Sequence, residues 1–276
     1  MDTVTLPDGS TMPKLGQGTW MIGDKDTTRA QEIEALREGV RLGLTLIDTA
    51  EMYGGGRSER LVGEAISDCR DEVYLVSKVT PGANRAQTIR ACENSLRNLG
   101  TDRLDLYLLH WAGGTAFAET VDAFRHLVTD GKIRRFGVSN LDAEEVQDFC
   151  SVPGGEQMQV NQLLFNLNQR GIEWDLLPWI QQHGMAMMAY SPFDRVDLLQ
   201  HRGLREFAQA RGITPGQAAL AWLLGHDHVV PIPKTSHVDR VRENAAALEV
   251  SLTAEDRDEL DRLFPPPKGP QHLEIY

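Results

Sequence analysis

The chain has 276 residues and a mass of 30.7 kDa, with 41% hydrophobic and 25% charged residues. These are ordinary values for a folded globular protein, and they exclude long disordered segments. Its 40 acidic residues against 28 basic ones give a net charge of -12, which disfavours binding to nucleic acid and to anionic membranes.

No apolar run is long enough to cross a bilayer, and the start of the chain lacks the pattern of a secretory signal. We therefore expect a cytoplasmic protein. The cysteines Cys69, Cys92 and Cys150 show neither metal-binding nor CxxC spacing, so we expect reduced thiols and no metal site.

In chain order, the first feature is a pair of short extended runs around Pro7-Asp8-Gly9, which predicts a β-hairpin over about residues 3–13. Short apolar runs then alternate with longer segments of helical period. Eight strand candidates follow the hairpin, at residues 14–20, 44–50, 73–79, 104–110, 133–140, 156–164, 186–192 and 229–234.

The intervening segments carry helix start and stop signals. The first amphipathic segment ends at Gly43, a residue suited to a helix C-terminus. Asp142 followed by Glu145, and Thr214 followed by Gln217, are typical of capping boxes at later helix starts.

Repeated strand–helix units with short loops are typical of a parallel sheet. Eight such units in about 250 residues favour an α/β fold of the (β/α)8, or TIM barrel, type, with the hairpin capping its bottom; a doubly wound open sheet is the alternative. Without a linker or a composition break, residues 1–276 are expected to form a single domain. The proline-rich residues 265–276 are expected to lie as a loop over the surface or the barrel mouth.

Polar residues recur where the predicted strands end, which is the end of a barrel that carries the chemistry in such folds. These residues are Asp48, Lys78, His110, Asn140, Gln162, Tyr190, Ser191 and Lys234. Each alone has an ordinary structural explanation, but their joint occurrence favours a site.

Asp48 and Lys78, on neighbouring strands, could be buried as a hydrogen-bonded pair. An ammonium near Tyr53 is expected to lower the pKa of its phenol and make it a proton donor near neutral pH. His110 could donate a hydrogen bond to a carbonyl oxygen in the same space. The group as a whole suits polarisation of a C=O bond.

The sequence contains no GxSxG nucleophile and no HExxH or cysteine cluster, so the attacking species should be a hydride from a bound cofactor. The stretch GQGTWM, residues 16–21, lacks the third glycine of a Rossmann fingerprint. A better phosphate site is the loop and helix start that contain Lys234, Thr235 and Arg240.

Several motifs in order, LIDTAEMYGGG, LVSKV, LDLYLLHW, GVSN, NQLLFN, AYSPF and IPKTSHVDRVREN, resemble the aldo-keto reductases. The likeness runs from about Leu15 to Asn244. The likeness implies a (β/α)8 barrel that binds NADPH without a Rossmann fold. Within the family, the sequence most resembles bacterial single-domain members that reduce methylglyoxal and related ketoaldehydes.

The resemblance also implies roles for individual residues. Asp48, Tyr53, Lys78 and His110 would form the catalytic tetrad, with Tyr53 as general acid. The cofactor-binding residues would be Thr19, Ser139, Asn140, Gln162, Tyr190, Ser191, Lys234, Thr235, Arg240, Glu243 and Asn244. Trp20, Met52 and Trp111 would form an apolar pocket wall.

The chain departs from the family after the seventh strand, where SPFDRVDLL replaces the usual leucine and glycines; here Arg195 could contact the pyrophosphate. The short tail implies an open pocket and small substrates. The expected function is NADPH-dependent reduction of small aldehydes and ketones by a monomer. The alternatives are a nucleotide-sensing binding subunit with little turnover, and the same enzyme working in reverse to oxidise an alcohol with NADP.

Overall fold

The computed structural model describes residues 2–276 and contains one large parallel sheet and one small antiparallel hairpin. Neighbouring strands of the eight-stranded sheet follow chain order, and all of them pair in parallel. The strands are β3 (Gly16–Gly18), β4 (Leu46–Asp48), β5 (Tyr74–Val79), β6 (Leu106–Leu109), β7 (Phe136–Ser139), β8 (Val160–Leu164), β9 (Ala186–Tyr190) and β10 (Val229–Pro231).

The sheet curls until its two outer strands meet. Gly18, the last residue of β3, forms a parallel bridge with Lys234 just beyond β10, and its amide donates to the carbonyl of Pro233 at 3.0 Å. A side chain at Gly18 would place its Cβ 2.8 Å from the carbonyl oxygen of Ile232, so glycine is required at this closure. The predicted barrel is confirmed, and the open doubly wound sheet is excluded.

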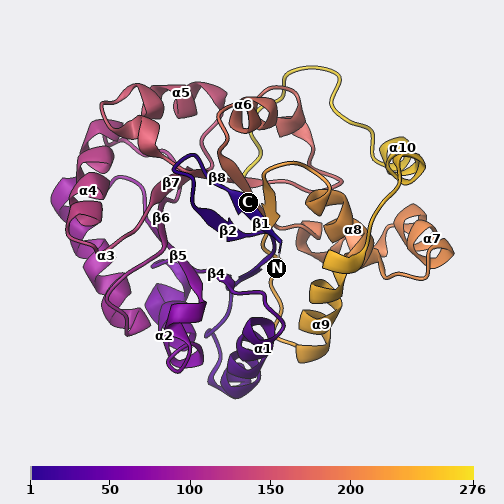
Figure 1. The fold of residues 1–276 in the computed structure, drawn as a ribbon, viewed down its shortest axis with the longest axis horizontal. Coiled ribbons are helices and arrows are strands. Elements are labelled where there is room, and N and C mark those ends of the chain that lie inside the picture. Colours follow the sequence, from indigo (N-terminus) through magenta and orange to yellow (C-terminus); the bar gives the residue numbers. More distant parts are fainter. Residues whose placement is uncertain (1) are drawn as a thin grey trace.

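Helices surround the barrel, as Figure 1 shows. They are α1 (Arg29–Arg41), α2 (Arg57–Ala65), α3 (Arg85–Leu99), α4 (Phe117–Thr129), α5 (Ala143–Ser151), α6 (Leu176–Gln182), α7 (Arg202–Ala210), α8 (Pro215–Leu224), α9 (Val238–Ala246) and α10 (Ala254–Leu263). None of the helices within residues 2–276 combines the length and apolarity that crossing a membrane requires.

The predicted local signals are present. Asp142 and Thr214 each accept a hydrogen bond from the amide three residues later, and Glu145 and Gln217 bond back, so both capping boxes are formed. Gly43 has a φ of +90° just after α1, the left-handed conformation that ends many helices. The region between β9 and β10 is less regular than strict alternation predicts, because it contains both α7 and α8.

The N-terminal hairpin pairs β1 (Thr3–Thr5) with β2 (Thr11–Pro13). Its apolar residues Val4 and Met12 belong to the same buried cluster as Leu46 and Val76 of the barrel strands. The hairpin therefore closes the bottom of the barrel, as predicted, and leaves the opposite end for the site.

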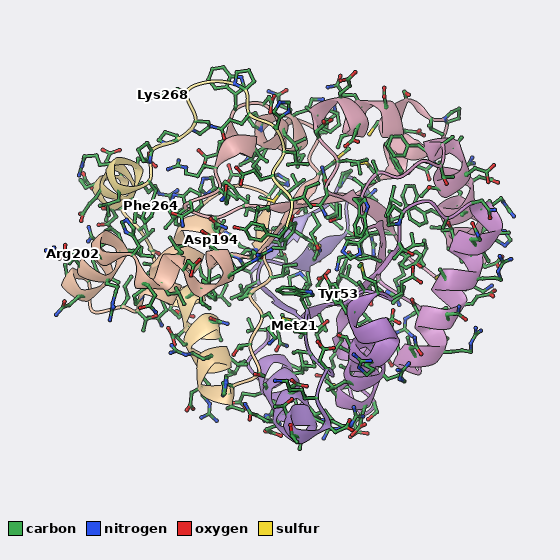
Figure 2. All side chains as sticks on the ribbon, turned by 180° about the vertical axis from the view of Figure 1, so that it is seen from behind. Met21, Tyr53, Asp194, Arg202, Phe264 and Lys268 are labelled. Carbon is green, nitrogen blue, oxygen red and sulfur yellow. The ribbon has the colours of Figure 1, made fainter. Side chains whose placement is uncertain are left out.

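The last residues, 265–276, have no regular structure. In Figure 2 this segment runs from Phe264 past Lys268 and across the face on which Tyr53 and Met21 lie. The tail thus lies over the barrel mouth, which is one of the two positions expected for it.

Candidate active site

The polar residues at the strand ends converge at the barrel mouth. Asp48 is the last residue of β4, Lys78 is the penultimate residue of β5, and His110 and Asn140 directly follow β6 and β7. All four side chains are buried, with at most 8% exposed. The parallel register brings together groups that are 30 or more residues apart in the sequence, such as Lys78 and Asp48.

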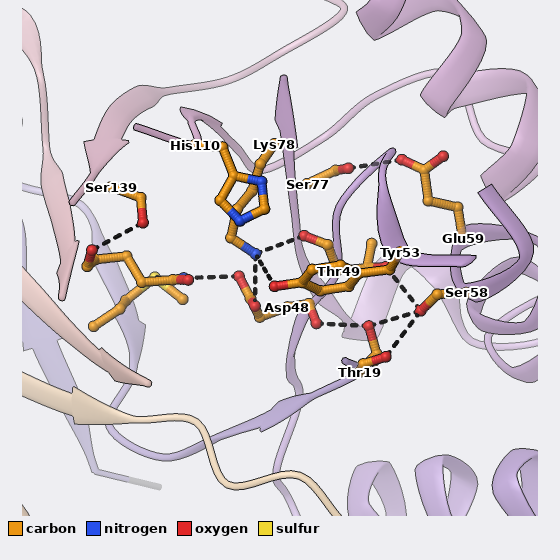
Figure 3. Close-up of polar contacts among 12 residues, drawn as sticks. Thr19, Asp48, Thr49, Tyr53, Ser58, Glu59, Ser77, Lys78, His110 and Ser139 are labelled. Carbon is orange, nitrogen blue, oxygen red and sulfur yellow. Dashed lines mark hydrogen bonds and ion pairs between the residues drawn. The ribbon is translucent and has the colours of Figure 1, made fainter. Parts of the chain in front are cut away.

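The centre of this group is the ammonium of Lys78, which is fully buried. It donates to Oδ2 of Asp48 at 2.8 Å, to the carbonyl oxygen of Thr49 at 2.8 Å and to the hydroxyl of Tyr53 at 3.5 Å, as Figure 3 shows. An ammonium has three N–H donors, so each has a partner. The Asp48–Lys78 pair predicted from the sequence is present, and the Thr49 carbonyl is an additional acceptor that side-chain patterns cannot reveal.

Tyr53 reaches this point because of an unusual turn. Gly54, Gly55 and Gly56 directly follow it, with φ angles of +57°, +62° and +82°. Three successive left-handed residues are readily adopted only by glycine. They let the chain reverse between the tyrosine and Arg57, where α2 begins.

The sequence-based expectation for the acidity of Tyr53 was wrong in direction. Burial of the phenol raises its pKa above the ordinary value, and Lys78 lowers it by less, while the Asp48 carboxylate raises it further. Before substrate enters, Tyr53 is therefore a protonated phenol throughout the neutral range. This is the form that a proton donor requires.

His110 lies beside Tyr53, with ring centroids 5.8 Å apart in an edge-to-face arrangement. Burial, together with the positive charge of Lys78, lowers its pKa to about 3, so the imidazole is neutral. Its Nδ1 is buried and has no hydrogen-bond partner among residues 2–276. A buried N–H without a partner is costly, so the favoured tautomer carries its proton on Nε2, where it can serve as a donor.

The lowered pKa of His110 predicts an acid-sensitive contribution to stability. The folded value is about 3 and the unfolded value about 6.5, so the unfolded chain binds more protons and stability falls as the pH drops from about 6.5 towards 3. Between pH 7 and pH 4, the free energy of unfolding of the wild type should therefore fall by roughly 3 kcal/mol more than that of a His110→Asn variant. Denaturant unfolding of both at the two pH values measures this difference; parallel pH dependences would contradict it.

A second set of contacts supports Asp48 and the neighbouring strand ends. Nε2 of Gln162 donates to Oδ1 of Asp48 at 2.8 Å, so both carboxylate oxygens are paired. The Ser139 hydroxyl donates to the Gln162 carbonyl at 2.9 Å. The Tyr190 hydroxyl donates to Oδ1 of Asn140 at 2.9 Å. The sequence placed these residues together but did not predict that Gln162 supports the carboxylate.

These groups line a cavity of about 320 Å³. Trp20, Met52 and Trp111, the predicted apolar wall, all contribute to its lining. Trp20 and Met52 are 52% and 44% exposed, so the cavity has an apolar rim open to solvent. That position suits contact with an entering small molecule.

The end of the chain also lines this cavity, through two residues that the sequence analysis did not name. Ile275 and Tyr276 contribute to the wall. The Tyr276 hydroxyl bonds to Asp194, and the guanidinium of Arg195 lies 4.0 Å from the Tyr276 ring centroid. The tail, although short, closes one side of the mouth, and no sequence pattern marks this contact.

The predicted phosphate-binding residues extend from the cavity to α9. Lys234 and Ser191 line the cavity, and Thr235 and Asn244 line a small neighbouring depression. Arg240 lies in the first turn of α9 and pairs with Glu243 at 2.5 Å. Lys234 is exposed and, within residues 2–276, has no acidic partner within salt-bridge distance. An unpaired ammonium beside this cavity fits the phosphates of a dinucleotide in a chain of net charge -12.

Thr19 occupies a different position from the other predicted cofactor contacts. It lines the cavity but is fully buried, and its hydroxyl donates to the Asp48 carbonyl at 2.9 Å while accepting from Ser58. Its side chain therefore supports the strand ends. Across the described part of the chain, residues 2–276, no three His, Cys, Asp or Glu side chains form a group that could hold a metal ion.

Comparison with known proteins agrees with this geometry. A model of the Aldo/keto reductase family matches residues 14–264. Methylglyoxal reductase YeaE of Escherichia coli (strain K12) is 50% identical over 270 residues, which cover 96% of this chain and 95% of that protein. Glyoxal reductase of Bacillus subtilis (strain 168) is 33% identical, covering 95% and 92%.

Among solved structures, an aldo-keto reductase from Klebsiella pneumoniae in complex with NADPH is 49% identical, with a TM-score of 0.97. The match covers 100% of this chain and 99% of that one. Sequence and fold agree over almost the full length, and the chain belongs to the aldo/keto reductase family.

Proposed function

We propose that this protein reduces small aldehydes and ketones, such as methylglyoxal, to alcohols with NADPH. The observation that carries this proposal is the buried Lys78 ammonium, which joins the Asp48 carboxylate to the Tyr53 hydroxyl at the edge of a cavity. A neutral histidine, His110, lines the same cavity. A proton donor and a hydrogen-bond donor meet where a carbonyl oxygen would lie.

In this mechanism, the neutral His110 donates a hydrogen bond from Nε2 to the carbonyl oxygen and orients it. Bound NADPH supplies a hydride from C4 of its nicotinamide to the carbonyl carbon. Tyr53 gives its hydroxyl proton to the oxygen, which completes the alcohol. Lys78 stabilises the phenolate left on Tyr53, and Asp48 holds Lys78 in place.

The chain's own polar groups would hold the cofactor along the cavity. Ser139, Asn140 and Gln162 would bind the carboxamide, and Tyr190 would stack on the nicotinamide ring. Ser191 would contact the pyrophosphate. The 2′-phosphate would be bound by Lys234, Thr235 and Arg240, and the adenine would be approached by Glu243 and Asn244. The relative from Klebsiella pneumoniae crystallised with NADPH supports this choice of cofactor.

Two observations support small carbonyl compounds as substrates. The cavity volume is about 320 Å³, part of which the nicotinamide would occupy, and the tail narrows the mouth at Tyr276. Two relatives, named methylglyoxal reductase and glyoxal reductase, also support small carbonyl compounds as substrates.

The test is NADPH consumption by the purified protein with methylglyoxal, glyceraldehyde, an aromatic aldehyde and a ketosteroid, followed by near-ultraviolet absorbance. Turnover on the first two, with little on the ketosteroid, supports the proposal. Tight NADPH binding, measured by fluorescence quenching, without turnover of any compound would contradict it and favour a nucleotide-sensing subunit.

Cofactor choice provides a further prediction. Arg240→Ala should weaken NADPH binding by roughly 10-fold and leave NADH binding nearly unchanged, because a charged hydrogen bond to the 2′-phosphate is lost. Arg242→Ala is the matched control, since Arg242 lies on the same helix and, like Arg240, forms an ion pair, with Glu38 at 2.7 Å, but is assigned no contact with the cofactor. Equal losses for both cofactors in Arg240→Ala would remove this role.

We also propose that the protein acts as a monomer in the cytoplasm. In support, the proposed mechanism requires no residue from a second copy.

A further inference from the structure

Two buried polar residues, Ser58 and Glu59, lie in the first turn of α2, directly after the glycine turn that carries Tyr53. Both have exposed fractions of 0%. The reaction proposed above gives neither a role. Buried polar side chains need partners, and the partners of these two residues connect α2 to three barrel strands.

Ser58 connects α2 to the ends of β3 and β4. Its hydroxyl lies 2.9 Å from Oγ1 of Thr19 and 3.1 Å from Oγ1 of Thr49. Thr19 in turn donates to the Asp48 carbonyl at 2.9 Å. The hydroxyls of Ser58 and Thr19 thus join the start of α2 to the backbone of Asp48, the residue whose carboxylate holds Lys78, and Thr49 adds a contact at the next residue, as Figure 3 shows.

Glu59 connects α2 to β5 and to α3. Its carboxylate accepts from the Ser77 hydroxyl at 2.7 Å and from Nδ2 of Asn98 at 2.9 Å. Among the described residues, no Lys, Arg or His side chain pairs with it. A buried carboxylate with only neutral partners is costly to fold, and its position near the N-terminus of α2 offsets only part of that cost.

Ser77 is the neighbour of Lys78 in β5, and successive side chains of a strand point to opposite faces. Lys78 points into the barrel toward Asp48, while Ser77 points outward to Glu59 on α2. The Glu59–Ser77 bond therefore fixes α2 against the strand directly behind the ammonium.

This connection matters because of the loosest contact in the site. The Lys78–Tyr53 distance is 3.5 Å, against 2.8 Å for the other two Lys78 contacts. Only Gly54, Gly55 and Gly56 separate Tyr53 from Arg57, where α2 begins. Because this link is so short, we expect a shift of α2 on the barrel to move the tyrosine relative to Lys78.

We propose that Ser58 and Glu59 are positioning residues that hold the Tyr53 hydroxyl within reach of Lys78. This inference rests on the proposed function, because it assigns the same tyrosine as proton donor. Neither residue touches the cavity; both act through the placement of α2.

The first test is Ser77→Ala, which removes one Glu59 hydrogen bond without adding bulk. The matched control is Ser95→Ala on α3, because the Ser95 hydroxyl is also buried but, among the described residues, forms no hydrogen bond with Glu59 or Lys78. In Ser77→Ala, kcat for methylglyoxal should fall roughly 10- to 100-fold, since displacements of about 1 Å can have that effect. The Kd for NADPH should stay within about twofold of wild type, and Ser77→Thr should restore most of the rate.

Glu59→Gln is the second variant and should lower kcat in the same way. A loss of kcat in Ser77→Ala no larger than in Ser95→Ala would overturn the inference. The inference would also be overturned if Ser77→Ala lost NADPH affinity by the same factor as kcat, because this result indicates general damage to the structure of the site.

One readout does not depend on turnover. The phenol of Tyr53 can be titrated as the ultraviolet difference between each protein and its Tyr53→Phe derivative. Ser77→Ala should shift that titration to higher pH, because Lys78 then stabilises the phenolate less. If the wild type reduces no carbonyl, the proposed function fails while this titration still decides the positioning role; an unshifted titration would contradict it.

Discussion

Tyr53→Phe should lower kcat for methylglyoxal reduction by roughly 1,000-fold or more and change the Kd for NADPH by less than about threefold. The variant keeps the ring, including its edge-to-face contact with His110, but removes the only proton that Lys78 can help to transfer. Positioned general acids contribute about 100- to 10,000-fold, which is the size of the loss expected when this donor is removed.

Steady-state kinetics and fluorescence titration of the same preparations measure the two quantities separately. Tyr107→Phe is the matched control, because this tyrosine is also buried but packs against Phe124 of α4, outside the barrel interior and away from the cavity. Loss of NADPH binding in Tyr53→Phe, or turnover near the wild-type level, would exclude Tyr53 as the proton donor.

Lys78→Met should lower the free energy of unfolding by about 3–5 kcal/mol and abolish turnover. The substitution leaves the Asp48 carboxylate buried with only Gln162 as a partner and leaves the Thr49 carbonyl without its donor. Removing one member of a buried ion pair has an effect of this size because the remaining charge is uncompensated.

The double variant Asp48→Asn/Lys78→Met separates stability from chemistry. It removes both charges and should regain most of the lost stability in denaturant unfolding, yet remain inactive. A double variant as unstable as Lys78→Met would show that the cost does not come from the unpaired carboxylate. Recovery of turnover in the double variant would contradict the role of the pair in tuning Tyr53.

The barrel and its strand-end residues could be predicted because both follow from local patterns. Apolar runs mark strands, and parallel strands place their ends together wherever the barrel closes. Asp48, Lys78 and His110 are recognisable because each polar residue lies at or near the end of such a run. These residues could be assigned to a common site without knowing the distances between their side chains.

The acidity of Tyr53 could not be predicted in the same way. The charge of Lys78 is visible in the sequence, but the burial of the phenol depends on all the segments around it, and burial has the larger effect on the pKa. A sequence pattern can show which charged residues lie near the phenol, but it cannot show how far the folded chain buries that phenol.

Contacts made by backbone atoms and by the tail were missed for a related reason. The Thr49 carbonyl carries no sequence signal as a partner of Lys78. Tyr276 reaches Arg195 across 81 residues through a segment without regular structure. The loop that carries Arg195 also has left-handed φ angles at Asp194, Arg195 and Val196. Residues other than glycine rarely adopt such angles, so the sequence gives no sign of them.

The most direct test of the central claim is to follow the hydride. Methylglyoxal is reduced with NADPH that carries deuterium on each face of the nicotinamide C4 in turn, and the product is examined by mass spectrometry and NMR. The account predicts that deuterium from one face alone appears on the carbon that bears the new hydroxyl, in wild type and in the Tyr107→Phe control. Tight NADPH binding with no deuterated alcohol would contradict it and leave a protein that binds the cofactor without reducing this carbonyl.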